Sequence, residues 1–200
     1  MKSKIKKIVG IIIVIILAYL YAHIAKVNAI YDKHVDNKDY ISTGIVQGEI
    51  EQEFVCVEDT LDGITVKCSV PEKVENIFVN LTVYDESGKK VAESELNTND
   101  MKNSKFNVFK FDTVENCKGK KFRVVFKNVN ARFDEGVGTS FFYEGKVEDG
   151  SALKIDGKDV GGTLIMKSVT NRFDLETMLV LLVFIAYIVG FMKVLYKLFK

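Results

Sequence analysis

The chain has 200 residues, of which 48% are hydrophobic and 28% are charged, with a single proline. This composition excludes a disordered chain and a proline-rich or collagen-like array. Seven of the 28 basic residues lie at the two ends, so the part between them carries 21 basic residues against 27 acidic ones. Because a nucleic-acid binder needs basic groups that displace counterions from phosphates, this acidic middle argues against a nucleic-acid partner.

The first predicted element is an apolar run at residues 8–25. As a helix it would be about 27 Å long, close to the hydrocarbon thickness of a bilayer. Four lysines precede it, which predicts a cytoplasmic tail at residues 1–7. The alternative is a cleaved signal peptide, because residues 27–29 (VNA) fit a small-residue cleavage site. Residues 26–47 are mixed and polar, and we expect them to form a stalk or a first short element.

A second apolar run, at residues 177–192, lies near the other end of the chain. The lysine that follows it can snorkel, which extends the predicted transmembrane helix to residues 177–195. Asp174 and Glu176 precede the run and lysines follow it, so the positive-inside rule places residues 196–200 in the cytoplasm. The two runs together predict a two-pass membrane protein. Both termini would be cytoplasmic, the central domain extracellular, and the lipid bilayer the first partner.

Between the two runs the apolar residues recur with a period of two. In residues 64–70 every second side chain is apolar, and the same alternation appears at 77–83 and 122–126. Turn residues favour connections at 59–63, 85–88 and 156–157. Further strands are predicted at 50–58, 90–96, 105–112, 140–147, 152–155 and 163–169. Short strands at this spacing predict a mainly β fold, an antiparallel β-sandwich or jelly roll over residues 48–170, flanked by the two transmembrane helices.

The turns and strand edges of this segment also resemble a known class of module. The motifs are Gly48–Phe54, Asp59–Ile64, Leu81–Ala92, Phe109–Phe111, Lys118–Phe122, Tyr143–Lys146, Leu153–Lys158 and Gly162–Leu164. They resemble the extracytoplasmic β-sandwich, jelly-roll-type module of bacterial envelope and polysaccharide-assembly membrane proteins. The resemblance covers roughly residues 48–169. It implies a module similar in outline to carbohydrate-binding modules, although such modules often carry a tryptophan and this chain has none.

Cys56 and Cys68 bracket the predicted turn at 59–63. A hairpin centred on residue 62 would place the two cysteines opposite each other. The sequence leaves two interpretations open, a disulfide in an extracellular domain or two small buried apolar residues. Cys117 is then the odd cysteine, and we expect a buried thiol in a loop.

Phe141, Phe142 and Tyr143 are consecutive in a predicted strand. Consecutive residues point to opposite faces of a strand, so at least one of these rings should face outward. An outward ring could stack on a sugar or pack on a partner protein, and the three are our candidates for ligand or partner contact. Ordinary core packing is the alternative.

Two acidic turns raise the question of a calcium site. Their carboxylates are Glu58, Asp59 and Asp62 in one turn and Asp134 and Glu135 in the other. Neither turn has the EF-hand pattern, so solvated carboxylates are the preferred interpretation and calcium the other; no further cofactor is expected. The sequence has no nucleophile–base pair, no zinc-ligand spacing and no Cys-x-x-Cys motif, and we therefore expect that the chain is not an enzyme.

These features together predict a membrane-anchored, non-catalytic extracellular module. It would bind an envelope glycan, or serve as the accessory subunit of an envelope-assembly membrane complex with a polytopic membrane protein as its partner. The alternative is an extracytoplasmic sensor or receptor subunit that signals through a membrane partner.

Overall fold

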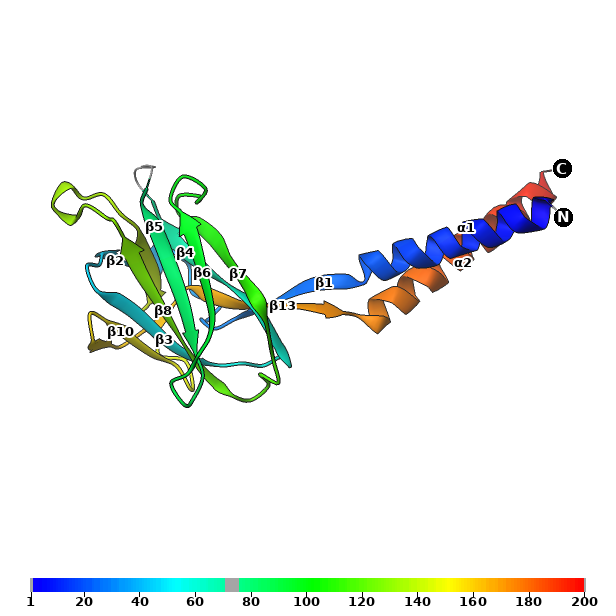
Figure 1. The fold of residues 1–200 in the computed structure, drawn as a ribbon. Coiled ribbons are helices and arrows are strands. Elements are labelled where there is room, and N and C mark those ends of the chain that lie inside the picture. The colour runs from blue at the N-terminus through cyan, green and yellow to red at the C-terminus, as the bar shows by residue number, and fades with distance from the viewer. Residues whose placement is uncertain (1, 71–75, 200) are drawn as a thin grey trace. The chain divides into compact units, whose positions relative to one another are not determined.

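The computed structural model describes residues 2–70 and 76–199. The chain divides into two compact units. One unit contains residues 1–26 and 171–200 and is built around two helices, α1 (Lys2–Tyr21) and α2 (Leu175–Leu198). The other unit is Val27–Thr170, which folds as β-structure (Figure 1). Met1 and Lys200, the outermost residues of the two predicted tails, lie outside the described residues.

The β-unit is built from two antiparallel sheets. In the described part of the chain the first, sheet A, has seven strands in the order β1-β13-β4-β9-β12, with β2 paired to β9 and β7 paired to β4. Its strands are β1 (His23–Ala29), β2 (Ile41–Ile45), β4 (Thr60–Ser69), β7 (Lys105–Glu115), β9 (Ser140–Glu144), β12 (Thr163–Leu164) and β13 (Met166–Phe173).

The second sheet, sheet B, has six strands over the same described residues, in the order β11-β10-β3-β8-β5-β6. These are β3 (Glu49–Val55), β5 (Phe78–Tyr84), β6 (Lys90–Asn97), β8 (Lys121–Val129), β10 (Ala152–Ile155) and β11 (Lys158–Val160). Two short 3-10 helices, η1 (Asn37–Asp39) and η2 (Phe133–Glu135), lie in the connections. The mainly β fold expected from the period of two is therefore confirmed, and the two sheets are consistent with a sandwich.

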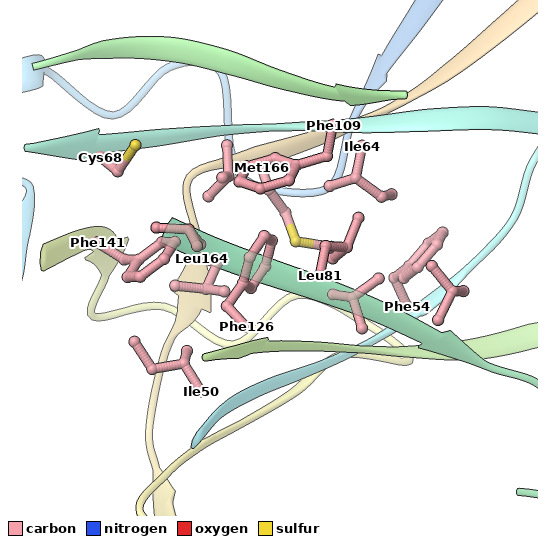
Figure 2. Close-up of a cluster of buried hydrophobic side chains, with 14 of the residues drawn as sticks. Ile50, Phe54, Ile64, Cys68, Leu81, Phe109, Phe126, Phe141, Leu164 and Met166 are labelled. Carbon is pink, nitrogen blue, oxygen red and sulfur yellow. The ribbon is translucent and has the colours of Figure 1, made fainter. Parts of the chain in front are cut away.

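The hydrophobic core is formed by the inner faces of both sheets. Phe126 of sheet B lies 5.6 Å from Phe109 and 5.0 Å from Phe141 of sheet A, measured between ring centroids. Figure 2 shows these rings in one cluster with Leu81 and Met166. Alternation along each strand places one apolar face in this cluster, which is why the pattern of residues 64–70, 77–83 and 122–126 predicted strands correctly.

A buried amide also joins the two sheets. Gln52 lies at an inward position of β3, and its Oε1 accepts a hydrogen bond from the Leu164 backbone N–H at 2.8 Å. Its Nε2 donates to Ser151 Oγ at 2.6 Å. Because a buried polar group without partners is costly, these bonds fix how β12 lies against β3.

Two predicted turns are present, and the third is absent. Asp85–Gly88 closes the β5–β6 hairpin, and Asp156 and Gly157 both have positive φ in the β10–β11 hairpin. The expected turn at 59–63 is wrong, because β4 begins at Thr60 and runs through Gly63. The chain does not fold back there: it leaves β3 in sheet B and enters β4 in sheet A.

Of the two expectations for residues 26–47, a stalk or a first short element, the structure contains a short element. Val27–Thr170 is one compact unit, and Ile41–Ile45 forms β2, which pairs with β9. The predicted helix at 8–25 ends earlier, at Tyr21, because His23–Ala29 forms β1 alongside β13. An apolar run reports burial in protein or lipid, and it does not by itself distinguish a helix from a strand that finds a partner.

The helical unit contains the candidate membrane segment. Among the described residues one helix, α2, is long and apolar enough to cross a membrane by length and composition. The apolar part of α1, Ile8–Tyr21, is shorter. The two helices contact each other and run antiparallel, so the first residues of α1 lie beside the last residues of α2 (Figure 1). Ala18 of α1 and Ala22, which follows the helix, are fully buried, as expected for small residues that allow close helix contact.

Candidate functional site

The outer face of sheet A gathers aromatic rings and lysines from segments far apart in the sequence. We call this set the aromatic–lysine face; its members are Tyr31, Tyr40, Lys67, Phe106, Phe142 and Lys167. The two tyrosines come from the chain between β1 and β2, residues 30–40, which we call the tyrosine segment. The other four residues lie on β4, β7, β9 and β13. Alternation along the strands sends neighbours such as Cys68 and Phe141 into the core, so these four side chains point outward.

Lys67 lies between two of the rings. Its Nζ is 4.7 Å from the ring centroid of Tyr40 and 5.7 Å from that of Phe142. It also donates a hydrogen bond to Asn37 Oδ1 at 3.0 Å. Partial burial lowers the pKa of Lys67 below its ordinary value, since the charged form loses hydration. The ammonium group is therefore held by rings and an amide in place of part of its water.

Phe106 is covered in a similar way. Lys167 Nζ lies 4.2 Å from its ring centroid, and the Tyr31 ring stacks with it at 6.3 Å between centroids. Tyr31 also meets Tyr40 edge to face at 6.3 Å, which holds the two ends of the tyrosine segment together. Burial raises the pKa of Tyr31, so its hydroxyl is protonated and able to donate a hydrogen bond.

A buried carboxylate borders this face. Glu144, at the end of β9, is 1% exposed, and its Oε1 accepts a hydrogen bond from the Asp32 backbone N–H at 2.8 Å. Within the described residues Oε2 has no hydrogen-bond partner. Burial raises the pKa of Glu144, because the ionised form loses its hydration.

Lys146 organises the charges beside Glu144. Its Nζ lies 2.9 Å from Asp32 Oδ2 and 2.8 Å from Glu148 Oε1. The hydrogen bond from Lys146 lowers the pKa of Asp32, and the two carboxylates raise the pKa of Lys146. This group fixes the tyrosine segment, through Asp32, to the end of β9.

A second concave region lies on sheet B, with a cavity of about 530 Å³. Both basic side chains that line it pair with carboxylates of β3: Lys121 Nζ lies 3.3 Å from Glu53 Oε2, and Arg123 forms an ion pair with Glu51. These are cross-strand pairs between β3 and β8, and cross-strand pairs stabilise a sheet. We therefore interpret these charges as ion pairs that stabilise sheet B, and not as a binding site.

The predicted contact residues divide as strand alternation requires. Phe141 is buried in the core, and Tyr143 is half-buried and packs against it. Phe142 faces outward and is the one that belongs to the aromatic–lysine face. The sequence did not identify the other members, because strand pairing and the tyrosine segment bring them to Phe142. Outward positions of Lys67 and Phe106 in the period of two were the only available signal.

The Cys56–Cys68 disulfide does not form in this structure, in which all three cysteines are free and buried. Its basis was the hairpin at 59–63, and the chain crosses there between sheets. Cys68 lies on β4, paired in register with Phe141, and its Sγ accepts a hydrogen bond from Asn107 Nδ2 at 3.2 Å. Burial raises the pKa of Cys68 to about 12. Cys117, expected as a buried loop thiol, is buried as predicted.

The acidic turns are placed differently from each other. Asp62 is buried and accepts a hydrogen bond from Thr113 Oγ1 at 2.6 Å, while Glu135 pairs with Arg132 at 2.8 Å. Within residues 2–70 and 76–199, no group of three or more His, Cys, Asp or Glu side chains is placed to hold a metal ion.

Comparisons with known proteins give no family for this chain. No protein-family model and no curated protein matches it. One solved structure, described as that of the infectious bursal disease virus Gt strain, is 12% identical, with a TM-score of 0.20. The match covers 82% of this chain and 47% of that one, so this chain spans about half the length of the viral chain. A similarity at this TM-score supports no conclusion about fold or function.

Proposed function

We propose that the chain is a membrane-anchored, non-catalytic module of the bacterial envelope. It would serve as the accessory subunit of an envelope-assembly membrane complex and contact a polytopic partner through the aromatic–lysine face. The observation that carries this proposal is the face itself. Tyrosine and phenylalanine rings are enriched in protein contact surfaces, and the two lysines give the patch a charge that an acidic partner surface can complement.

The same geometry favours a protein partner over an envelope glycan. A sugar ring stacks on an uncovered aromatic face. Here Lys67 lies over Tyr40 and Phe142, and Lys167 with Tyr31 covers Phe106. A protein partner can add acidic or hydroxyl groups to the lysines without displacing them, because each ammonium group has three N–H donors.

The anchoring part of the proposal rests on α2 and on the charges at its ends. The helix is long and apolar enough for a membrane, Glu176 lies in its first turn, and Lys197 lies in its last. With α1 alongside it as a second, shorter apolar helix, both termini would be cytoplasmic and Val27–Thr170 would lie outside. The resemblance of the strand motifs to envelope modules supports the same location.

Photocrosslinking in intact cells tests the contact surface. A photoreactive phenylalanine analogue at position 142 should crosslink the full chain to one membrane protein. The same analogue at position 84 is the matched control, since Tyr84 lies on sheet B with the Arg123 guanidinium 4.9 Å from its ring. Crosslinking from both positions alike, or from neither, would contradict the proposed surface.

A binding measurement then separates the two partner classes. The partner identified by crosslinking is then co-purified with the full chain in mild detergent, without crosslinking. Lys67→Ala and Phe142→Ala should each lower the amount of co-purified partner by roughly tenfold, the loss expected when a central contact residue is truncated. Tyr84→Ala should leave recovery unchanged. Retention of the full chain on purified envelope glycan, with the same dependence on Phe142, would instead identify a glycan-binding module.

A further inference from the structure

Cys56 and Cys117 lie in two connections that cross between the sheets. Cys56 follows β3 of sheet B and precedes β4 of sheet A, while Cys117 follows β7 of sheet A and precedes β8 of sheet B. The β3–β4 and β7–β8 connections therefore both link sheet A to sheet B, and each contains one of the two cysteines. The cysteines are far apart in the sequence, and the fold brings them together.

Backbone hydrogen bonds hold the two crossings against each other. The Cys56 N–H donates to the Lys120 carbonyl at 2.9 Å, and the Gly119 N–H donates to the Cys56 carbonyl at 2.8 Å. The Cys117 N–H donates to the Asp59 carbonyl at 2.8 Å. A further bond from the Lys120 N–H to the Cys117 carbonyl, at 3.0 Å, closes a tight turn. The positions of both cysteine backbones are therefore fixed relative to each other.

The side chains meet inside this arrangement. Cys56 and Cys117 both belong to the hydrophobic core, and their thiols lie close enough that each shifts the pKa of the other. Each sulfur also has a backbone acceptor, Glu58 O at 3.3 Å from Cys56 Sγ and Val114 O at 3.1 Å from Cys117 Sγ. Both side chains are buried, at 1% and 0% exposure.

We propose that Cys56 and Cys117 form a disulfide while the chain folds in the presence of a disulfide oxidant, and that Cys68 remains a free thiol. The backbone bonds hold the two cysteine main chains in adjacent crossings, and both side chains enter the same core. Cys68 lies on β4, and its sulfur is engaged by Asn107. It is therefore the unpaired cysteine of the three.

The reaction is a thiol–disulfide exchange with a small disulfide such as oxidised glutathione, or with a disulfide oxidoreductase of the envelope. The thiolate of one cysteine attacks the external disulfide, forms a mixed disulfide and releases one reduced thiol. The second cysteine then attacks the protein sulfur of the mixed disulfide and releases the other. Two protein thiols lose two electrons and two protons, which the external disulfide takes up as two thiols.

Burial of the two thiols determines at which stage of folding they can be oxidised. In the folded, reduced chain burial raises the pKa of Cys56, and that of Cys117 to about 11. The thiolate is the reactive species, and it is both scarce and shielded there. The exchange therefore takes place before β4 and β8 close over the sulfurs. Oxidation of the pair in cells rests on the proposed extracytoplasmic location, because disulfides persist in oxidising compartments.

Refolding of the purified full chain tests the pairing directly. The chain is unfolded with reductant, refolded in detergent with a mixture of reduced and oxidised glutathione, and then denatured and tagged with a maleimide polymer. We expect one tag after oxidative refolding and three after refolding with reductant. Peptide mapping should place the crosslink between Cys56 and Cys117. Three tags under oxidising conditions, or a crosslink that includes Cys68, would overturn the inference.

Variants and a measurement in cells complete the test. Cys68→Ala should refold with no taggable thiol, whereas Cys117→Ala should give two tags and no intramolecular crosslink. The wild-type tag count does not depend on whether any variant folds. Chains quenched with alkylating agent in intact cells distinguish the two proposals: a pair that oxidises on refolding but stays reduced in cells contradicts the extracytoplasmic location alone.

Discussion

Gly162 lies just before β12, where the chain passes very close to β9. A Cβ at this position would meet the Glu144 carbonyl oxygen and the Tyr143 ring, and a carbonyl of a paired strand cannot move aside freely. Gly161 has nothing within 4 Å of the equivalent position. The two neighbouring glycines thus form a matched pair of sites.

We expect Gly162→Ala to lower the free energy of unfolding by about 1–3 kcal/mol, the usual cost of overpacking, while Gly161→Ala leaves it nearly unchanged. Denaturant titration of the full chain in detergent, followed by tyrosine fluorescence, measures both. Equal stability of the two variants would show that β12 does not approach β9 as closely as described.

Glu144 should make stability depend on pH. Its pKa in the folded chain lies above the ordinary value of 4.5, so the folded state binds the proton more tightly than the unfolded state. Stability from this group is therefore complete at low pH and falls as pH rises through the raised pKa. Asp32 and Lys146 form an ion pair next to Glu144. Because the carboxylates raise the pKa of Lys146, this lysine stays charged while Glu144 titrates.

The variant Glu144→Gln removes this titration and keeps an oxygen that can accept from the Asp32 N–H. We expect the wild-type free energy of unfolding to decline relative to the variant as pH rises from the ordinary carboxyl pKa of 4.5 through the raised pKa of Glu144. Denaturant titrations at several pH values provide the comparison. Parallel profiles for the two proteins would mean that Glu144 is not buried in the folded state.

At the scale of elements, a Cys56–Cys117 disulfide would bind together the β3–β4 and β7–β8 crossings. It would close a loop of roughly 60 residues in the unfolded chain, and loss of chain entropy from such a loop stabilises the fold by about 4 kcal/mol. We expect reductant to lower the denaturation midpoint of the oxidised chain accordingly. The double variant Cys56→Ala/Cys117→Ala, whose midpoint reductant should not change, is the control.

Most strands could be predicted from the sequence because each has one face in the core. The alternation of Ile64, Val66 and Cys68, for example, reports burial on one side of β4. The partners of a strand are not written in that pattern. The crossing from β3 to β4 therefore looked like a hairpin, since its Asp and Gly residues suit a turn and the bulged start of β4 equally well.

The candidate site was predictable to a smaller extent. Alternation within β9 could show that one ring of the Phe141–Tyr143 stretch faces outward. It could not show that Lys67 and Phe106 lie beside Phe142, because that depends on the pairing of β4 with β7 and β9. For the same reason, the sequence could not predict that Cys56 and Cys117 lie in adjacent crossings. Both require the long-range topology that joins the sheets.

The whole chain combines a β-unit, Val27–Thr170, with an apolar helix, α2. The β-unit contains the acidic surplus of the chain and the aromatic–lysine face, whereas α2 has the length and composition of a membrane segment. The proposed accessory role requires that the β-unit lie outside the cell and the end of α2 inside. Orientation is therefore the property on which the partner surface and the oxidation of Cys56 and Cys117 in cells both depend.

Cysteine labelling in intact cells tests this orientation most directly. Lys89→Cys places a thiol in the exposed β5–β6 turn, and Leu198→Cys places one at the exposed end of α2, while the native cysteines are buried. A membrane-impermeant maleimide should label position 89 in intact cells and position 198 only after permeabilisation. Labelling of position 198 from outside, with position 89 protected until permeabilisation, would contradict the account.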